Sequence, residues 1–219
     1  DLLVETRELK SQDEKRHPSD FAIWIKADER HLLRWNAPWS NGFPGWHLEC
    51  SVMSTKYLGE RFDIHGGGND LKFPHHENEI AQSYGACGNT PANYWIHSNM
   101  LLLNGKKMSK SEGNNITPVQ IFTGDSPHIS KAYSPMTLRF FFLQAHYSST
   151  LDLNDASLSG AEKGYRRLIE TYNTLKGLTT TVAKNDTPLA AEIHQGIRDA
   201  FDEMNDDFNA PKALARLFE

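Results

Sequence analysis

The spacing of apolar residues changes near residue 150, and this change constrains the fold more than any other feature of the sequence. From residue 158 the apolar side chains recur every three or four positions, at 158, 161, 165, 168, 172 and 175. This spacing predicts one face of a long helix that Gly177 closes. After a Thr-rich linker over 178–187, a second helix is predicted from Pro188 to about Met204. The last third of the chain is therefore expected to be all-helical.

Before residue 150, strand-like and helix-like segments alternate, as in an α/β fold. A strand over 61–65 is expected to end in the glycine turn 66–68, and a strand over 95–103 in the Asn104-Gly105 turn. The predicted helices cover 47–58, run from within 70–74 to Tyr84 before Gly85, and follow Thr117 and Ser134 for about 6 and 12 residues. We expect an α/β part followed by a helical part.

The composition describes a globular chain and excludes several other classes. Hydrophobic residues make up 38% of the 219 residues, charged residues 23%, and five are tryptophan, which excludes disordered and low-complexity proteins. The longest apolar runs, 100–103 and 140–143, are too short to cross a bilayer. Two cysteines cannot form a disulfide framework, so we expect a reducing, cytoplasmic compartment. Because the chain starts without methionine and stops within an apolar helical pattern, we interpret it as a fragment.

The segment Lys107-Met108-Ser109-Lys110-Ser111 carries the sharpest chemical signal. Two lysines three residues apart, with hydroxyls and Gly113 nearby, follow a predicted strand. Such ammonium groups suit a triphosphate, because each is a point charge for phosphate oxygens and can stabilise a departing pyrophosphate. Lysine–serine loops are also common as solvated surface, and composition alone favours that interpretation.

A second signal is the segment His75-His76-Glu77-Asn78-Glu79 on a predicted helix. His75 and Glu79 are four residues apart and share a helix face, so both can bind one metal ion. Cys50 would add a thiolate, which makes a zinc set of three ligands. Alternatively, His75 and Glu79 are an ordinary exposed pair on a helix and Cys50 is a small core residue. These residues by themselves leave both the zinc site and this alternative open.

The segment 62–70 combines a strand, three glycines and the start of a predicted helix. Glycines allow a nucleotide to approach the backbone, the helix end favours an anion, and Asp70 could accept hydrogen bonds from ribose hydroxyls. The segment does not match the dinucleotide-binding glycine pattern, and a plain glycine-rich turn is the simpler interpretation.

Four segments in register resemble the cysteinyl-tRNA synthetases, a family of class I aminoacyl-tRNA synthetases. They are 44–50, 62–68, 73–79 and 107–111, and both their order and their spacing fit the family. One such segment would be a weak signal, whereas four together are specific. The resemblance runs from about residue 14 to the end.

The resemblance implies ATP-dependent activation of cysteine to cysteinyl adenylate, with Mg²⁺ accompanying ATP, and transfer to tRNA(Cys). It implies zinc bound by Cys50, His75 and Glu79, by one further cysteine near the start of such enzymes, and by the substrate thiolate. Zinc binds a thiolate far better than a serine hydroxyl, so a metal can discriminate where a hydrophobic pocket could not.

The resemblance also assigns the remaining site residues. Trp46 and His65 correspond to residues that line the cysteine pocket, and Lys107 and Lys110 to catalytic lysines of a mobile loop, with Lys110 nearer to ATP. The residues expected at ATP are Lys107, Met108, Ser109, Lys110, Ser111, Gly67 and Asp70.

The implied architecture is the second half of a Rossmann-like catalytic domain followed by an all-helical region. The expected parts are the end of a connecting insertion (1–20), the catalytic half (21–150), a stem-contact region (151–178) and the start of a C-terminal bundle (188–219). The family's His-Ile-Gly-His signature and first zinc cysteine do not occur here. We expect this chain alone to be inactive and to bind tRNA poorly, and its parent to be a monomer with no membrane partner.

Two other functions compete with this interpretation. A cysteine ligase acting on an amino sugar would share the lysine loop and the zinc residues. A catalytically silent zinc-binding module would not need its lysines and would unfold when the metal is removed. A metal hydrolase is disfavoured, because Cys50 and a substrate thiolate leave little room for an activated water.

Overall fold

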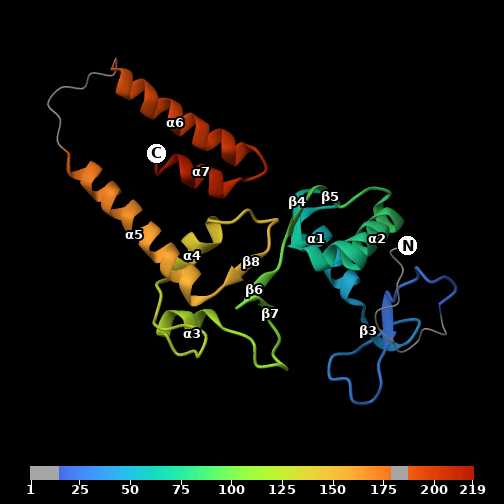
Figure 1. Ribbon diagram of the computed structural model, residues 1–219. Coiled ribbons are helices and arrows are strands. Elements are labelled where there is room, and N and C mark those ends of the chain that lie inside the picture. The colour runs from blue at the N-terminus through green and yellow to red at the C-terminus, as the bar shows by residue number, and fades with distance from the viewer. Residues whose placement is uncertain (1–14, 179–186) are drawn as a thin grey trace. The chain divides into compact units, whose positions relative to one another are not determined.

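The computed structural model describes residues 15–178 and 187–219 (Figure 1). Contacts divide the chain into two compact units, Asp1–Ile96 and His97–Glu219, and each is described by itself. The predicted insertion end (1–20) lies largely outside the described residues, as does nearly all of the Thr-rich linker.

The first unit begins with a small antiparallel sheet of order β1-β3-β2. Its strands are β1 Trp24–Lys26, β2 Trp35–Asn36 and β3 Asn41–Pro44. Gly42 lies opposite both Lys26 and Trp35 in the register, so β3 is the central strand. β3 runs through Gly45 directly into helix α1, Trp46–Leu58, and thereby fixes where α1 begins.

The rest of the first unit places a second helix beside α1. Strand β4, Phe62–Gly68, pairs with β5, Ala92–Ser98, and helix α2, Glu77–Cys87, packs against α1. A short 3-10 helix, Asn69–Leu71, and one wide turn, Lys72–His76, connect β4 to α2. This connection brings the histidine segment to the α1–α2 pair.

Three boundary predictions in this unit were wrong. The glycines 66–68 continue strand β4 instead of forming a turn, since Gly68 is extended at φ −75°, ψ 159°. The helix expected to start within 70–74 begins at Glu77, because Phe73 is extended (φ −138°, ψ 133°), as a residue before proline tends to be. It ends at Cys87, three residues beyond the expected Tyr84, and is capped by Gly88, whose left-handed φ of 74° suits glycine.

The second unit contains a three-stranded sheet of order β7-β6-β8. Its strands are β6 Leu101–Leu103, β7 Lys106–Lys107 and β8 Leu151–Leu153, with β8 parallel to β6. The predicted Asn104-Gly105 turn is confirmed, with positive φ at both residues (52° and 74°), and it joins β6 to β7. The strand expected over 95–103 is interrupted at Asn99 and Met100, so β5 and β6 are separate strands.

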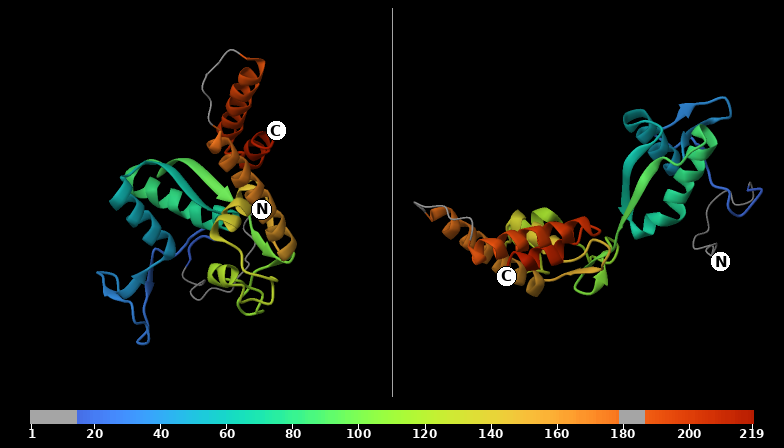
Figure 2. Two further views of the ribbon diagram at one scale, coloured as in Figure 1. Left: turned by 90° about the vertical axis from the view of Figure 1, so that its left-hand side faces the viewer. Right: turned by 90° about the horizontal axis from the view of Figure 1, so that it is seen from above.

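The helices of the second unit are α3 Pro118–Thr123, α4 Pro135–Leu143, α5 Asp155–Gly177, α6 Pro188–Asn205 and α7 Ala210–Arg216. Thr117 and Ser134 cap α3 and α4 as predicted, each with proline following. α4 has nine residues where about twelve were expected. From residue 154 the described chain contains helices and their connections only, and α6 and α7 lie side by side (Figure 2).

The core of the second unit lies where α4 and α5 pack beside the sheet. Leu103, Leu153, Leu158, Ala161 and Tyr133 are 0–2% exposed within it. The predicted apolar face of α5 is buried only at its N-terminal end, since Tyr172 and Leu175 are exposed. None of the described helices is long and apolar enough to cross a membrane.

Candidate functional site

Three side chains from different parts of the first unit converge to form a candidate metal centre. Cys50 comes from α1, His75 from the turn before α2, and Glu79 from the first turn of α2. Their ligand atoms all lie within 4.8 Å of one another. His75 and Glu79 are 4% and 2% exposed. The spacing had paired His75 with Glu79, the family resemblance had added Cys50, and the packing of α1 against α2 brings the three together.

The arrangement of Glu79 and His75 fits a bound cation. His75 Nε2 lies 2.9 Å from Glu79 Oε1, yet this oxygen is buried and accepts no hydrogen bond from any residue that the structure describes. His75 Nε2 and Glu79 Oε1 are thus close together, but their geometry is not that of a hydrogen bond. A cation between them would satisfy both lone pairs, and the set of one sulfur, one imidazole nitrogen and one carboxylate oxygen suits zinc. The residues therefore fit zinc.

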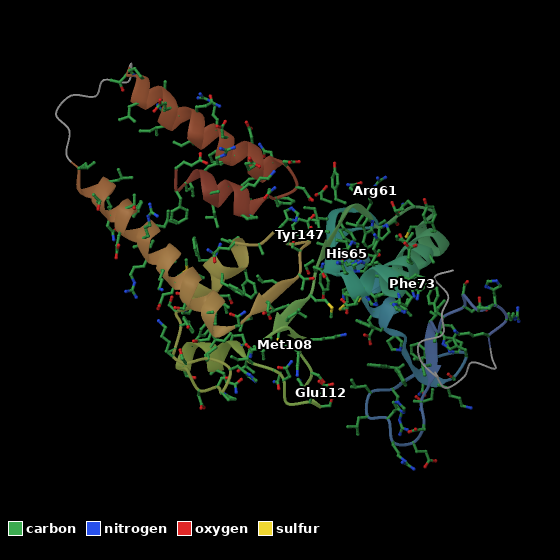
Figure 3. The ribbon with its side chains drawn as sticks, in the orientation of Figure 1. Arg61, His65, Phe73, Met108, Glu112 and Tyr147 are labelled. Atoms are coloured by element: carbon green, nitrogen blue, oxygen red, sulfur yellow. The ribbon has the colours of Figure 1, made fainter. Side chains whose placement is uncertain are left out.

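Two further histidines contact His75 and Glu79 of this candidate centre. His65 on β4 has Nε2 2.8 Å from Glu79 Oε2 (Figure 3). His47 on α1 has Nδ1 2.8 Å from His75 Nδ1. The hydrogen bonds and the close His75–Glu79 approach form a continuous series from α1 through α2 to β4.

Aromatic rings surround this series. Trp46, 58% exposed, lies with its ring centroid 4.2 Å from that of His75. Trp95 on β5 lies 4.9 Å from both His65 and His76. Gly67 allows the close approach of His76, because a Cβ there would lie 2.8 Å from its ring. Gly67 therefore has a packing reason to be glycine, whatever binds nearby.

A second candidate group shares Glu79 with the first. Ligand atoms of His65, His76 and Glu79 also lie within 4.8 Å of one another. Since Glu79 Oε2 already accepts from His65, the carboxylate offers the two groups different oxygens. None of the sequence motifs assigned a role to His47 or His76. The spacing of His47 and Cys50, three residues apart on one helix, was the available signal.

The electrostatics of the centre favour neutral groups. Burial, together with the nearby Glu79 and Glu49 carboxylates, raises the pKa of the Cys50 thiol. Burial and the neighbouring His75 lower the pKa of His47. A bound cation reverses this preference for a coordinating thiol, which then loses its proton.

The predicted lysine loop lies in the second unit, where Lys107 ends strand β7 and residues 108–111 follow it. Ser109 and Asn114 close it by exchanging backbone hydrogen bonds of 3.0 and 3.2 Å, and Asn114 Nδ2 donates to the Lys107 carbonyl at 3.1 Å. Ser109 and Ser111 hydroxyls lie 2.9 Å apart. Lys107 and Lys110 are exposed, and neither forms an ion pair among the described residues. Figure 3 labels Met108 and Glu112, which belong to this segment.

The structure thus gathers one group of the predicted site residues in the first unit. Cys50, His75, Glu79, Trp46 and His65 lie together there. Gly67 lies against His76, while Asp70 is exposed and turns its carboxylate toward Gly68. The loop 107–111 belongs to the second unit and is described separately.

Comparison with known proteins adds independent findings. The family described as tRNA synthetases class I (C) catalytic domain matches residues 1–163. The chain is 51% identical over 220 residues to a cysteine–tRNA ligase of Cytophaga hutchinsonii and 52% over 221 residues to that of Parabacteroides distasonis, covering all of this chain and 44% of each relative. It is 52% identical to that of Deinococcus radiodurans over 94% of this chain and 40% of the relative. The chain therefore spans less than half the length of these relatives.

A solved structure supports the fold. A ternary complex of an Agrobacterium radiobacter LeuRS with tRNA and LeuAMS matches with a TM-score of 0.53 and 15% identity, over 90% of this chain and 28% of that one. The mixed α/β fold therefore resembles part of a class I synthetase, as expected from the sequence.

Proposed function

Because this chain belongs to the family of class I tRNA synthetases with the cysteine-type catalytic domain, we propose that it is part of a cysteine–tRNA ligase. The whole enzyme would activate cysteine with ATP, accompanied by Mg²⁺, and transfer the cysteinyl group to tRNA(Cys) in the cytoplasm. The observation that carries the proposal is the convergence of Cys50, His75 and Glu79 on one buried point.

Zinc is the proposed resident metal, held by Cys50, His75 and Glu79 together with a ligand from outside this chain. When bound, it supplies an electrophile that prefers a thiolate sulfur to a hydroxyl oxygen. The side chains do the rest of the selection. Trp46 and His65 would line the cysteine pocket: the Trp46 ring packs on His75, and His65 holds Glu79.

The lysine loop serves the activation step. The cysteine carboxylate attacks the α-phosphorus of ATP, the bond to the bridging oxygen breaks, and pyrophosphate departs with the electron pair. Lys107 and Lys110 are exposed and without ion pairs among the described residues, so their charges are available for the phosphates. Met108, Ser109 and Ser111 complete the loop around ATP.

Gly67 and Asp70 are proposed to lie at the nucleotide. Asp70 is exposed at the end of β4, where its carboxylate can accept hydrogen bonds from ribose hydroxyls. Gly67 has a demonstrated packing partner in His76, so its part in ATP binding would be through the backbone.

The domain organisation follows from the same proposal. Residues 1–20 would end a connecting insertion, 21–150 form the second half of a Rossmann-like catalytic domain, 151–178 contact the tRNA stem, and 188–219 begin a helical bundle. The exposed Tyr172 and Leu175 on α5 are consistent with further chain covering that helix. The whole enzyme is proposed to act as a monomer.

The test is ATP–pyrophosphate exchange by the full-length protein, with cysteine and with serine, followed by transfer to tRNA or to an amino sugar. We expect exchange with cysteine, none with serine, and transfer to tRNA. Transfer only to the amino sugar would keep the chemistry and replace the acceptor. No exchange by folded, zinc-loaded protein would overturn the proposal in favour of a silent zinc-binding module.

A further inference from the structure

The contact between His47 and His75 links the protonation of the two rings. Their Nδ1 atoms lie 2.8 Å apart, and His75 is 4% exposed. A neutral imidazole has one N–H and one bare nitrogen, so in such a pair one ring donates and the other accepts. Fixing one ring therefore fixes the other.

The surroundings of the second nitrogen of His75 decide the direction. His75 Nε2 faces Glu79 Oε1 at 2.9 Å without forming a hydrogen bond, and Cys50 completes the candidate metal centre with these two residues. A metal ligand must present a bare nitrogen, which leaves the His75 proton on Nδ1. His47 Nδ1 must then accept that proton's hydrogen bond.

We propose that His47 is a positioning residue of the metal centre, which accepts a hydrogen bond from His75 and so holds His75 Nε2 bare and aimed at the ion. His47 stands three residues before Cys50 on α1, so a single helix carries both a ligand and the partner of another ligand. The inference rests on the proposed function only in taking the ion to be zinc.

The position of the His47 ring is itself constrained by packing. Phe21 meets it edge-on with centroids 5.6 Å apart and an interplanar angle of 88°. The His75 ring lies 4.6 Å away on another side. His65 performs the matching task for Glu79 from β4, at 2.8 Å. Each of the two buried ligands thus has its own histidine partner, supplied by a different element.

The test uses two substitutions that separate the hydrogen bond from the packing. His47→Asn keeps an acceptor oxygen near the position of Nδ1, whereas His47→Phe keeps a ring but removes the acceptor. His31→Asn, an exposed histidine of the same unit, is the matched control. Each full-length protein is titrated with Co²⁺ against a chromophoric chelator, and the thiolate and d–d absorption bands are recorded.

We expect His47→Phe to weaken Co²⁺ binding by about 10–100-fold and to change the absorption bands. His47→Asn should recover most of the affinity and the original spectrum, and His31→Asn should match the unmodified protein. Unchanged binding in His47→Phe, or equal losses in the Phe and Asn variants, would overturn the proposal. So would an unmodified protein that binds no cobalt.

A second readout avoids substitution. Nitrogen NMR of the ¹⁵N-histidine-labelled, zinc-loaded protein should show His75 protonated at Nδ1, and protonation at Nε2 would contradict the proposal. Neither experiment involves ATP, cysteine or tRNA. Absence of cysteine activation would therefore count against the proposed function and leave this inference intact.

Discussion

The candidate metal centre and the lysine loop differ in how many of their polar side chains have partners within the protein. His75 and Glu79 are almost fully buried, and each contacts a further histidine. Lys107 and Lys110 are exposed on a loop that backbone hydrogen bonds and Asn114 close at its base. The first region is built before any substrate arrives, whereas the second offers charges that only a ligand can use.

This difference separates stability from catalysis. Groups that are buried and mutually bonded contribute to both folding and binding, so their loss affects both. Exposed lysines without an ion pair add little to folding, and their proposed part is in the transition state of the activation step. Substitutions in the two regions should therefore have different signatures.

The largest effect is expected at Lys110. In the full-length protein, Lys110→Ala should lower the rate of cysteine-dependent pyrophosphate exchange by about 10²–10³-fold, because a charge on the departing pyrophosphate loses its partner. The free energy of unfolding should change by less than about 0.5 kcal/mol, since Lys110 is exposed. Lys106→Ala, exposed in the same hairpin, is the control and should leave exchange unchanged. Equal losses in both variants would show that the loop acts only through its overall charge.

Metal removal should affect the other region. A chelator should lower the Tm of the full-length protein, and added zinc should restore it. When free zinc is at 100 times its Kd, binding should stabilise the folded state by about 2.7 kcal/mol. Cys50→Ser should reduce this zinc-dependent shift, because a hydroxyl replaces the thiolate. Cys87→Ser is the matched control, since Cys87 lies outside the centre. A full shift in Cys50→Ser would remove Cys50 from the ligand set.

A smaller effect is expected at the base of the lysine loop. Asn114→Ala removes the hydrogen bond to the Lys107 carbonyl but leaves the backbone pair with Ser109. If losing this hydrogen bond raises the activation free energy of exchange by about 1 kcal/mol, the exchange rate should fall roughly fivefold. Metal affinity should not change. Asn115→Ala serves as the neighbouring control, and a weaker metal affinity in Asn114→Ala would break the distinction between the two regions.

The last effect concerns stability alone, in the core of the second unit. Burial raises the pKa of Tyr133 to about 12, and its hydrogen bond to Asp155, 2.8 Å long, acts in the same direction. The folded state therefore holds this proton more tightly than the unfolded state, whose tyrosine pKa is about 10. Stability from Tyr133 is present below pH 10 and is lost as the pH rises toward 12.

Urea unfolding at several alkaline pH values tests this prediction. Tyr133→Phe should show a shallower loss of stability between pH 10 and 12 than the unmodified protein, with the exposed Tyr172→Phe as the control. An identical pH dependence in all three proteins would contradict it.

Local sequence signals predicted the structure where a few neighbouring residues decide it. Asn104-Gly105, with its two positive φ angles, and the capping residues Thr117 and Ser134 are such cases. The i, i+4 spacing of His75 and Glu79 likewise brought two candidate ligands together. In each case the deciding interaction lies within one turn of the chain.

Longer-range packing decided what the sequence could not. Gly67, which continues β4, packs closely against His76, which lies nine residues later in the sequence. His47 finds its partner 28 residues away. The residue pattern of α5 predicted an apolar face but not which end of that face would be buried by other described residues.

Recognition of the cysteine thiolate by the metal centre is the central claim of the proposed function. X-ray absorption at the zinc edge of the zinc-loaded, full-length protein tests this directly, with and without substrate. We predict zinc–sulfur scattering at about 2.3 Å before addition, an increase in that signal with cysteine, and none with serine. An unchanged sulfur signal on adding cysteine, at a concentration that supports pyrophosphate exchange, would contradict the account.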